Sequence, residues 1–288
     1  MAFQDARDYQ ILFLCSFLML GIFSRDWTVN PLLMAAILST CVLAQGLFLK
    51  SSHFWGQSQR LNGGIPESPS LLNFSSLKSS LITGLGLCLL LRANQLDTVI
   101  LAAGLAIASK FVFRFRGKHF FNPANFGIIA ALILTQDAWI SPGQWGTDWW
   151  YLLLFLSAGG LVLNKVGRWD TSVVFLGIYS SLEAIRNYWL GWDSDVLFHH
   201  LSSGSLLVFA LFMLTDPRSM PNATISRLIW ASGIAVVTFI LQYTLYLPTA
   251  MFWALFCFSP LTLLFDSHWF APRFTWQKLT PLSPQFNR

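Results

Sequence analysis

The sequence predicts an all-α integral membrane protein with about ten transmembrane helices, arranged in two inverted five-helix repeats that contain broken helices. Three observations carry this prediction: the composition, the number of long apolar runs, and the distribution of Lys and Arg. Of the 288 residues, 55% are hydrophobic and 11% are charged, whereas soluble domains are about 25% charged. The chain therefore lacks the polar surface that a soluble protein needs. This composition excludes a soluble enzyme, a disordered tail and a disulfide-stapled secreted module.

Ten apolar runs approach the length of about 20 residues that a helix needs to cross a bilayer. They lie near residues 9–24, 31–49, 77–92, 95–113, 125–140, 149–165, 171–190, 197–214, 225–247 and 249–266. The stretch 51–76 is rich in Ser, Gly and Asn and is predicted to be a loop. We expect one membrane domain over residues 1–288, with a first repeat at 9–140, a second at 149–266 and a cytoplasmic tail at 267–288.

The basic residues divide between the two sides that ten helices would create. Fifteen of the 18 Lys and Arg residues fall on the side shared by both termini: Arg7, Lys50, Arg60, Lys78, Lys110, Arg114, Arg116, Lys118, Lys165, Arg168, Arg218, Arg227, Arg273, Lys278 and Arg288. Arg25 and Arg92 fall on the other side, and Arg186 lies within a span. The positive-inside rule places both termini in the cytoplasm, in a bacterial-type inner membrane. Because these residues form no single patch, a nucleic-acid partner is not expected.

Familiar soluble-enzyme motifs are absent from the sequence. The four cysteines lie inside apolar runs without a C-x-x-C pair, so we expect inert thiols and no metal site. No small-residue cleavage site follows the first apolar run, so a cleavable signal peptide is not expected. Without a nucleotide-binding glycine loop or a nucleophile elbow, we assign no catalytic residue, and any redox chemistry would come from a bound cofactor.

A weak internal symmetry accompanies the ten runs. Ser80 opens a short span and Pro123 heads a later one, and Ser203 and Pro248 stand in the same order in the second half. Two five-helix halves must be inverted relative to each other, because five is odd. Transporters built in this way hold their sites near the midplane of the membrane, where broken helices end. Chance similarity between two apolar runs is the alternative explanation.

The segment 114–127 is the most unusual in the chain, because it combines basic residues, aromatic residues and two asparagines. Pro123 suits the first turn of a helix, and Asn122 before it is a natural N-cap. Asn125 then presents amide donors at the start of a membrane helix. A helix N-terminus carries about half a positive charge, which suits a flavin or quinone carbonyl. Capping alone would explain Asn122 but not Asn125.

Three ionisable residues are candidates for an ion pathway. Glu183 and Arg186 are three residues apart within a span, so they share a helix face and are able to pair. Ionisable groups at membrane depth are costly and mark functional sites, although a structural ion pair is an equal alternative. Asp216, followed by Pro and Arg, is either functional or a helix stop with a local ion pair. His199 and His200 are a weaker signal, because adjacent side chains point to different helix faces.

Three stretches of the chain resemble the D subunit of the Rnf electron-transport complex and the B subunit of the sodium-pumping NADH:quinone oxidoreductase (RnfD and NqrB). They are residues 77–84, residues 117–127 with the motif F-N-P-A, and residues 200–217 with the motif T-D-P. The similarity extends from about residue 75 to Arg273. The resemblance implies ten spans in two inverted halves, and a flavin-carrying subunit that couples electron transfer to sodium or proton movement.

The chain departs from this family at the site of flavin attachment. Relatives carry FMN esterified to a Thr in an S-x-A-T loop between the fifth and sixth spans. Here that connection runs only from Gln136 to Asp148 and contains no such motif. The pair Ala223-Thr224 is preceded by Pro221 rather than Ser and falls on the cytoplasmic side. We therefore expect no covalent FMN, and a short member of the family.

Together these features predict a membrane subunit of a redox-linked ion-translocating system, in contact with the lipid bilayer and with other membrane subunits. We expect it to hold FMN or riboflavin without a covalent bond. The candidate cofactor-binding residues are Asn122, Asn125, Lys118, Thr83 and Ser203, and the candidate ion-pathway residues are Glu183, Arg186 and Asp216. The alternatives are a stand-alone transporter or channel of the same fold without redox activity, and a structural or assembly subunit.

Overall fold

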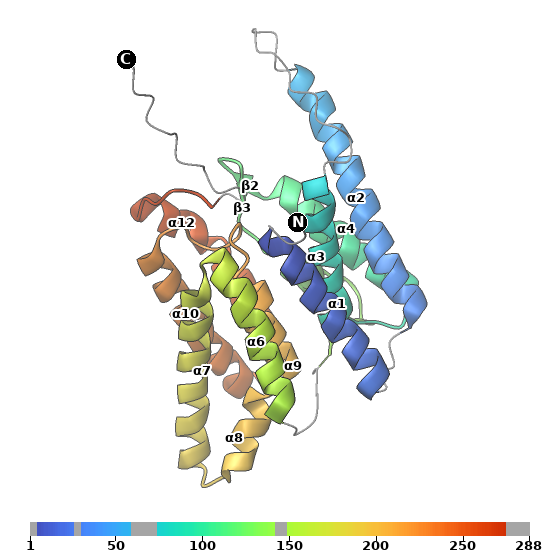
Figure 1. The fold of residues 1–288 in the computed structure, drawn as a ribbon. Coiled ribbons are helices and arrows are strands. Elements are labelled where there is room, and N and C mark those ends of the chain that lie inside the picture. The colour runs from blue at the N-terminus through green and yellow to red at the C-terminus, as the bar shows by residue number, and fades with distance from the viewer. Residues whose placement is uncertain (1–4, 26–29, 59–73, 142–148, 275–288) are drawn as a thin grey trace, which may run out of the picture.

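The structure, a computed structural model, describes residues 5–25, 30–58, 74–141 and 149–274. Within these ranges the chain forms long helices, with two small antiparallel two-stranded sheets between them (Figure 1). The prediction of an all-α architecture is confirmed, and the short strands are an addition to it.

The first half of the chain runs to residue 141. Its described elements are α1 (Ala6–Arg25), α2 (Pro31–Ser58), α3 (Phe74–Leu90), β1 (Leu91–Arg92), α4 (Leu96–Val112), β2 (Arg114–Phe115), β3 (Lys118–His119), α5 (Pro123–Leu134) and β4 (Trp139–Ile140). Strand β1 pairs with β4, and β2 pairs with β3. The first of these pairs joins the end of α3 to the segment after α5.

The second half contains more and shorter pieces. Its described elements are α6 (Trp149–Val166), α7 (Trp169–Trp189), α8 (Ser194–Leu201), α9 (Gly204–Val208), the π-helix η1 (Phe209–Met213), α10 (Thr224–Thr244), α11 (Ala250–Phe258) and α12 (Leu261–His268). The helices α8 and α9–η1 follow one another with a bend of 47°, and α11 and α12 with a bend of 46°.

Local sequence explains where several helices begin and end. Asn30 precedes Pro31 at the start of α2, and its side-chain oxygen accepts a hydrogen bond from the backbone of the first turn. Asn122 and Pro123 repeat this arrangement at the start of α5. Gly167 has a φ of +70° at the end of α6, a left-handed conformation that other residues adopt only with strain. It produces the tight turn into α7.

Each of the ten predicted apolar runs is a helix or a bent helix pair in the structure, but ten membrane spans remain a prediction. Among the described residues, three helices are long and apolar enough to span a membrane: α1, α2 and α10. The two bent pairs would raise this number to five. Helices α3, α5 and α6 are apolar but shorter.

Two predicted boundaries are wrong. The predicted loop at 51–76 is partly helical, because α2 continues to Ser58 and α3 already begins at Phe74, and residues 59–73 lie outside the described residues. The predicted span 125–140 is helical only to Leu134, after which the chain turns into β4. The backbone of β4 pairs with β1. Hydrogen bonds between these two strands therefore take the place of the helical hydrogen bonds that were predicted for residues 139 and 140.

The two halves share a packing pattern. Helix α2 packs against α4 as α7 packs against α10, and α4 packs against α5 as α10 packs against α11. In Figure 1 the first half lies on the right and the second on the left. This arrangement is the one that two five-helix repeats would produce, and the exact repeat boundaries stay a prediction.

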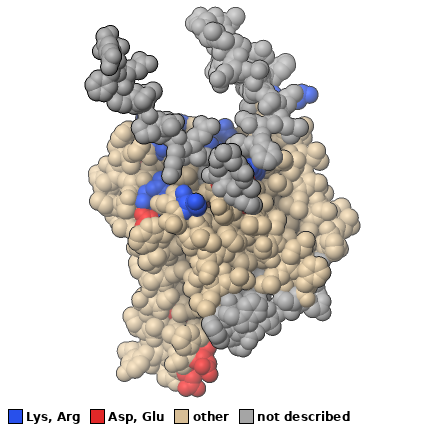
Figure 2. Space-filling view, in the orientation of Figure 1, with Lys and Arg blue, Asp and Glu red and all other residues tan. Residues whose placement is uncertain are grey.

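The two ends of the helical body differ in charge. Lys and Arg gather at the upper end in Figure 2, which we call the basic end, with a small acidic patch beside them. The larger group of Asp and Glu lies at the lower end, near α8, which we call the acidic end. The start of α1 and the end of α12 both lie at the basic end in Figure 1. Large exposed aromatic residues mark both ends, as expected at membrane interfaces: Tyr188, Trp189, Trp192 and Tyr246 near the acidic end, and Trp169 and Phe270 near the basic end.

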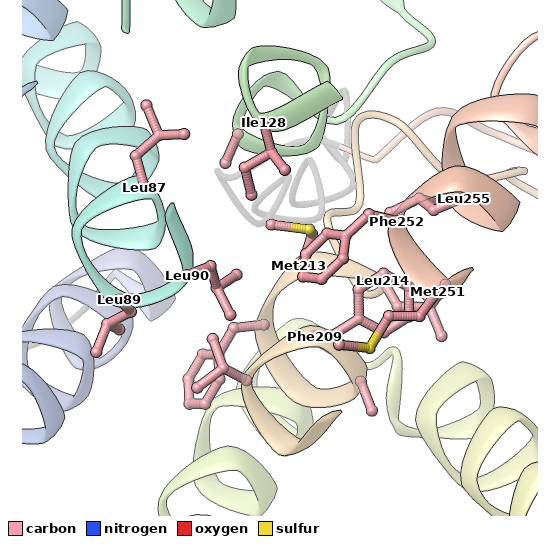
Figure 3. Packing of buried hydrophobic residues seen from close by; sticks show 14 of the residues in the cluster. Leu87, Leu89, Leu90, Ile128, Phe209, Met213, Leu214, Met251, Phe252 and Leu255 are labelled. Atoms are coloured by element: carbon pink, nitrogen blue, oxygen red, sulfur yellow. The ribbon is translucent and has the colours of Figure 1, made fainter. Parts of the chain in front are cut away.

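A continuous apolar core joins the halves. Leu87 and Leu90 of α3 and Ile128 of α5 approach Met213 of η1 and Phe252 of α11 (Figure 3). The short helices α5 and α11 thus lie where the two halves meet, and this position makes the polar residues in their first turns informative.

Candidate functional site

The start of α5 is tied to the second half of the chain by side-chain amides. Asn122 is the N-cap, and its Oδ1 accepts a hydrogen bond from the backbone N–H of Asn125 at 3.0 Å. Its Nδ2 donates to the carbonyl oxygen of Met213, at the end of η1, also at 3.0 Å. Asn122 therefore caps one half-length helix and anchors it to the end of another.

Asn125 makes a second connection between the halves. Its Nδ2 donates to the carbonyl oxygen of Phe252 at 3.1 Å. Both residues are the third residues of their helices, so the first turns of α5 and α11 meet here. The side chain is fully buried, and its Oδ1 has no hydrogen-bond partner among the described residues. We call Asn122, Asn125, Met213 and Phe252 the junction cluster.

The carbonyl of Met213 is accessible to Asn122 because Met213 is the last residue of η1, and the last carbonyls of a helix have no partner within it. It also accepts the backbone N–H of Asp216 at 3.3 Å. In η1 the backbone N–H of Leu214 reaches the carbonyl of Phe209, five residues back, at 2.8 Å, and this widened turn disturbs the ordinary ladder. A second side chain bonds a carbonyl within η1. Ser172 Oγ of α7 donates to the carbonyl of Ala210 at 2.6 Å, in addition to the bond from Asn122. Such π-turns are frequent at functional sites.

Charged residues lie next to the junction cluster, toward the basic end. His119 Nε2 is 3.6 Å from Asp216 Oδ2, and the backbone N–H of Arg218 donates to Asp216 Oδ1 at 3.1 Å. Burial raises the pKa of Asp216, but His119 and the backbone N–H of Arg218 outweigh burial, so the pKa lies below its ordinary value. Asp216 is therefore an ionised group that connects the end of η1 to strand β3.

Lys118 has protein partners at the same end. Its Nζ donates to Asp266 Oδ2 and to the carbonyl oxygen of Met220, both at 2.6 Å. Burial lowers the pKa of Lys118, and the Asp266 carboxylate only partly offsets this. Lys118, which was predicted to bind a cofactor, joins strand β3 of the first half to the end of α12 in the second half.

The two remaining predicted cofactor residues lie on different helices. Thr83 of α3 donates from Oγ1 to the carbonyl of Ser79, and the buried Lys110 of α4 donates to the same carbonyl at 3.1 Å. Helix α3 also contacts α5, so Thr83 lies on a helix beside the junction cluster. Ser203 instead lies at the bend before α9, where its Oγ is 2.9 Å from Ser205 Oγ. The structure does not gather all five predicted residues into one site.

Glu183 and Arg186 meet a common tyrosine instead of each other. The described contacts include no ion pair between them. The hydroxyl of Tyr243 on α10 lies 2.8 and 2.7 Å from the two carboxylate oxygens of Glu183. The guanidinium of Arg186 lies over the ring of the same Tyr243, 3.8 Å from its centroid. Tyr243 therefore contacts both charged groups, one through its hydroxyl and the other through its ring.

This group lies far along the helices from the junction cluster. Glu183 belongs to the last turns of α7 and Tyr243 to the last turn of α10, both toward the acidic end. His200 of α8 completes it, with Nδ1 3.4 Å from Tyr243 Oη and 3.7 Å from Glu183 Oε2. We call Glu183, Arg186, His200 and Tyr243 the acidic-end cluster. The acidic-end cluster and the junction cluster are therefore separate groups.

A known protein family matches the part of the chain that contains both bent helix pairs. Residues 137–274 match the sequence model of the NQR2, RnfD, RnfE family. The match includes η1, the T-D-P motif and the acidic-end cluster, and the resemblance predicted from the sequence is confirmed over this region.

Curated relatives agree with the family match. The chain is similar to the D subunit of the ion-translocating oxidoreductase complex from Halorhodospira halophila, with 30% identity over 129 residues, which is 42% of this chain. The corresponding proteins from Shewanella denitrificans and Vibrio vulnificus are 30% identical over 150 and 118 residues, or 49% and 40% of this chain. The matched regions cover only 34%, 41% and 33% of the lengths of these three relatives.

The junction cluster does not fit a flavin in the arrangement seen here. The two amide groups predicted to receive a flavin carbonyl already donate to the carbonyls of Met213 and Phe252. The atom left without a described partner, Asn125 Oδ1, is an acceptor, whereas a flavin carbonyl or an anionic reduced flavin needs donors. A flavin could reach these amides only by displacing a carbonyl from the other half. We therefore derive no chemical step through a flavin.

Several residues of the site were missed by sequence reasoning. His119 stands within the singled-out segment 114–127, so its place beside Asp216 had a local signal. Tyr243 and Asp266 had none, because each is an ordinary polar residue near a helix end and its partner lies far away in the sequence. Lys110 was counted only for its charge, although a buried lysine inside a span is itself a signal.

Proposed function

We propose that this chain is a membrane subunit of a redox-linked system that couples electron transfer to the transport of sodium or protons across the membrane. The observation that carries this proposal is the match of residues 137–274 to a family whose curated relatives are D subunits of an ion-translocating oxidoreductase complex. The two half-length helices that meet by their first turns support it, because transporter sites form where broken helices end.

The proposed ion pathway contains Glu183, Arg186 and Asp216. Glu183 and Asp216 lie in polar clusters toward opposite ends of the second half, with the junction cluster between these ends. Ions would approach one cluster from each side of the membrane. The basic end would face the cytoplasm under the positive-inside rule, which would place both termini there. Reporter fusions to the two termini test this orientation, and termini on opposite sides would contradict it.

A non-covalent flavin is the second part of the proposal, and purification of the full chain with its membrane partners tests it. A flavin absorbance spectrum that disappears in Asn125→Leu would place the flavin at the junction cluster and require the Phe252 carbonyl to be displaced. A spectrum that persists in Asn125→Leu would place it elsewhere. We expect no covalent FMN, so the denatured 32.5 kDa chain should show no fluorescence under ultraviolet light in a gel.

The main alternative is a stand-alone transporter or channel of the same fold without redox activity, which the close packing between the two halves also permits. The same preparation separates the candidates. Ion flux in liposomes without any redox partner supports the alternative. Stable co-purification with other membrane subunits and flux that depends on an electron donor support the proposed function. Co-purification without flavin or flux would indicate an assembly subunit.

A further inference from the structure

Glu183 is a buried carboxylate that stays connected to an exposed side chain. Only 4% of the residue is exposed, and both of its oxygens face the hydroxyl of Tyr243. His200 touches the same hydroxyl and is far more accessible, with 35% of its side chain exposed. A continuous series of hydrogen-bonding groups therefore leads from the surface to the carboxylate.

The groups around the carboxylate are suited to protons and not to a metal cation. The ionisable or polar side chains that face it are Tyr179 and Arg186 from α7, His200 from α8, and Gln242 and Tyr243 from α10. Hard cations need several oxygen acceptors, whereas the nearest partner here is a hydroxyl donor and a guanidinium lies over the ring of the same tyrosine. A second positive charge beside Arg186 would be repelled.

The polar series ends inside the second half. Tyr179 lies one helical turn from Glu183 and donates to Gln242 Oε1 at 2.8 Å. Three fully buried rings follow Tyr179: Phe175, Phe209 and Phe252. The distance between ring centroids is 6.0 Å from Tyr179 to Phe175, 5.4 Å from Phe175 to Phe209 and 5.5 Å from Phe209 to Phe252. Phe252 belongs to the junction cluster. Three aromatic rings thus separate the acidic-end cluster from the place where the two halves meet.

We propose that Glu183 is a proton-binding site reached from the acidic end through His200 and Tyr243, and closed toward the junction cluster by Phe175, Phe209 and Phe252. Asp193 and Asp195, at the start of α8, lie near the entrance and would raise the local concentration of protons. This inference rests on the proposed ion-translocating function, and it names the ion at this end of the pathway.

The transfer balances without any further reactant. A hydronium ion gives a proton to Nε2 of His200 and leaves as water, while the proton on Nδ1 passes to the oxygen of Tyr243. The hydroxyl proton of Tyr243 passes at the same time to Glu183. Glu183 ends as a neutral carboxylic acid, Tyr243 is again a neutral phenol, and His200 ends neutral with its proton on Nε2 in place of Nδ1.

Infrared spectroscopy of the full chain in lipid nanodiscs tests the proposal without a redox partner. Acidification should produce the carbonyl band of a protonated carboxylic acid, and Glu183→Gln should abolish that band. In deuterated water the band should shift quickly in the wild type. We expect the shift to slow by at least about tenfold in Tyr243→Phe, which keeps the ring under Arg186, and in His200→Gln, because each removes a positioned proton carrier. His199→Gln is the control, because His199 is exposed next to His200 and outside the cluster.

Each outcome decides the proposal. Exchange that is unchanged in both Tyr243→Phe and His200→Gln overturns it. A band midpoint that depends on sodium, compared with choline at equal ionic strength, also overturns it and identifies a sodium site. If Glu183→Gln fails to fold, the exchange rate in Tyr243→Phe decides alone. Absence of ion flux or of co-purification would contradict the proposed function without changing these infrared spectra. A failure of the proposed function is therefore distinguishable from a failure of the proton-binding proposal.

Discussion

The two halves of the molecule use the same helix pairs but differ in continuity. In the first half, α3 is an unbroken helix of 17 residues. The corresponding stretch of the second half is divided into α8, α9 and the π-helix η1, with a bend of 47°. Polar side chains make contacts at these breaks. Ser203 bonds Ser205 at the bend, Ser172 donates to the carbonyl of Ala210 within η1, and Asn122 donates to the carbonyl of Met213 at the end of η1. The half that contains most of the family match is thus the one in which this helix is broken, and side chains from other helices bond the carbonyls of η1.

The halves also differ in what holds their helices close together, and this difference gives the largest predicted effect. A Cβ added to Gly127 of α5 would lie 2.5 Å from the carbonyl oxygen of Ala102 and 2.8 Å from Cβ of Ala106. A Cβ added to Gly233 of α10 would meet the ring of Phe258, at the end of a side chain. A backbone carbonyl is unable to move away alone, whereas a ring is able to rotate.

We therefore expect Gly127→Ala to destabilise the protein by about 2–3 kcal/mol, because α4 and α5 must separate. Gly233→Ala should change stability by less than about 1 kcal/mol, because the higher helix propensity of Ala offsets a small movement of the ring. Denaturant unfolding of both variants in the same detergent measures the contrast. Equal losses would show that the two close approaches are equivalent.

The second prediction compares the two asparagines of the junction cluster. Asn122 caps α5 and bonds the second half, whereas the side chain of Asn125 only bonds the second half. Asn122→Ala should cost about 2 kcal/mol, since it removes an N-cap worth about 1 kcal/mol and a hydrogen bond between the halves worth a similar amount. Asn125→Leu should cost less than about 1 kcal/mol, because the bond to Phe252 is lost together with a buried acceptor that has no described partner. Thermal unfolding of the two variants measures the difference. If Asn125→Leu is the more damaging change, Asn125 Oδ1 has a partner that stabilises it.

Sequence reasoning reached the elements of this fold but not most of their contacts. The apolar runs located the ten helices or helix pairs, and the Asn122-Pro123 pair located the start of α5, because these features depend on local composition. The acceptors of Asn122 and Asn125 are backbone carbonyls, which have no sequence signature. The bend before α9 contains no proline, and Tyr243 reaches Glu183 from a helix far along the chain. These features depend on tertiary packing, and therefore a single sequence does not reveal them.

The third prediction uses pH to test the ion pair beside the junction cluster. Asp216→Asn should lower stability by about 1 kcal/mol near neutral pH, because the carboxylate beside His119 carries a charge-assisted interaction. The pKa of Asp216 is depressed in the folded state, so this stabilisation is present above the ordinary value of 3.8 and is lost as the pH falls through the folded pKa. The wild type and Asp216→Asn should therefore converge in acid. A difference that stays constant with pH would contradict an ionised Asp216.

The last prediction concerns the π-helix that distinguishes the second half. Ser172 is buried on α7, and its hydroxyl donates to the carbonyl of Ala210 in η1 at 2.6 Å. Ser172→Ala should cost about 1 kcal/mol, because it leaves that carbonyl without its side-chain donor. Ser181→Ala is the matched control: Ser181 lies on the same helix, is exposed, and bonds only the carbonyl of Gly177 within α7. Thermal unfolding of both variants should show a loss only for Ser172→Ala. Equal, negligible losses would mean that η1 keeps its shape without support from α7, and that the break in the second half arises from the sequence of η1 itself.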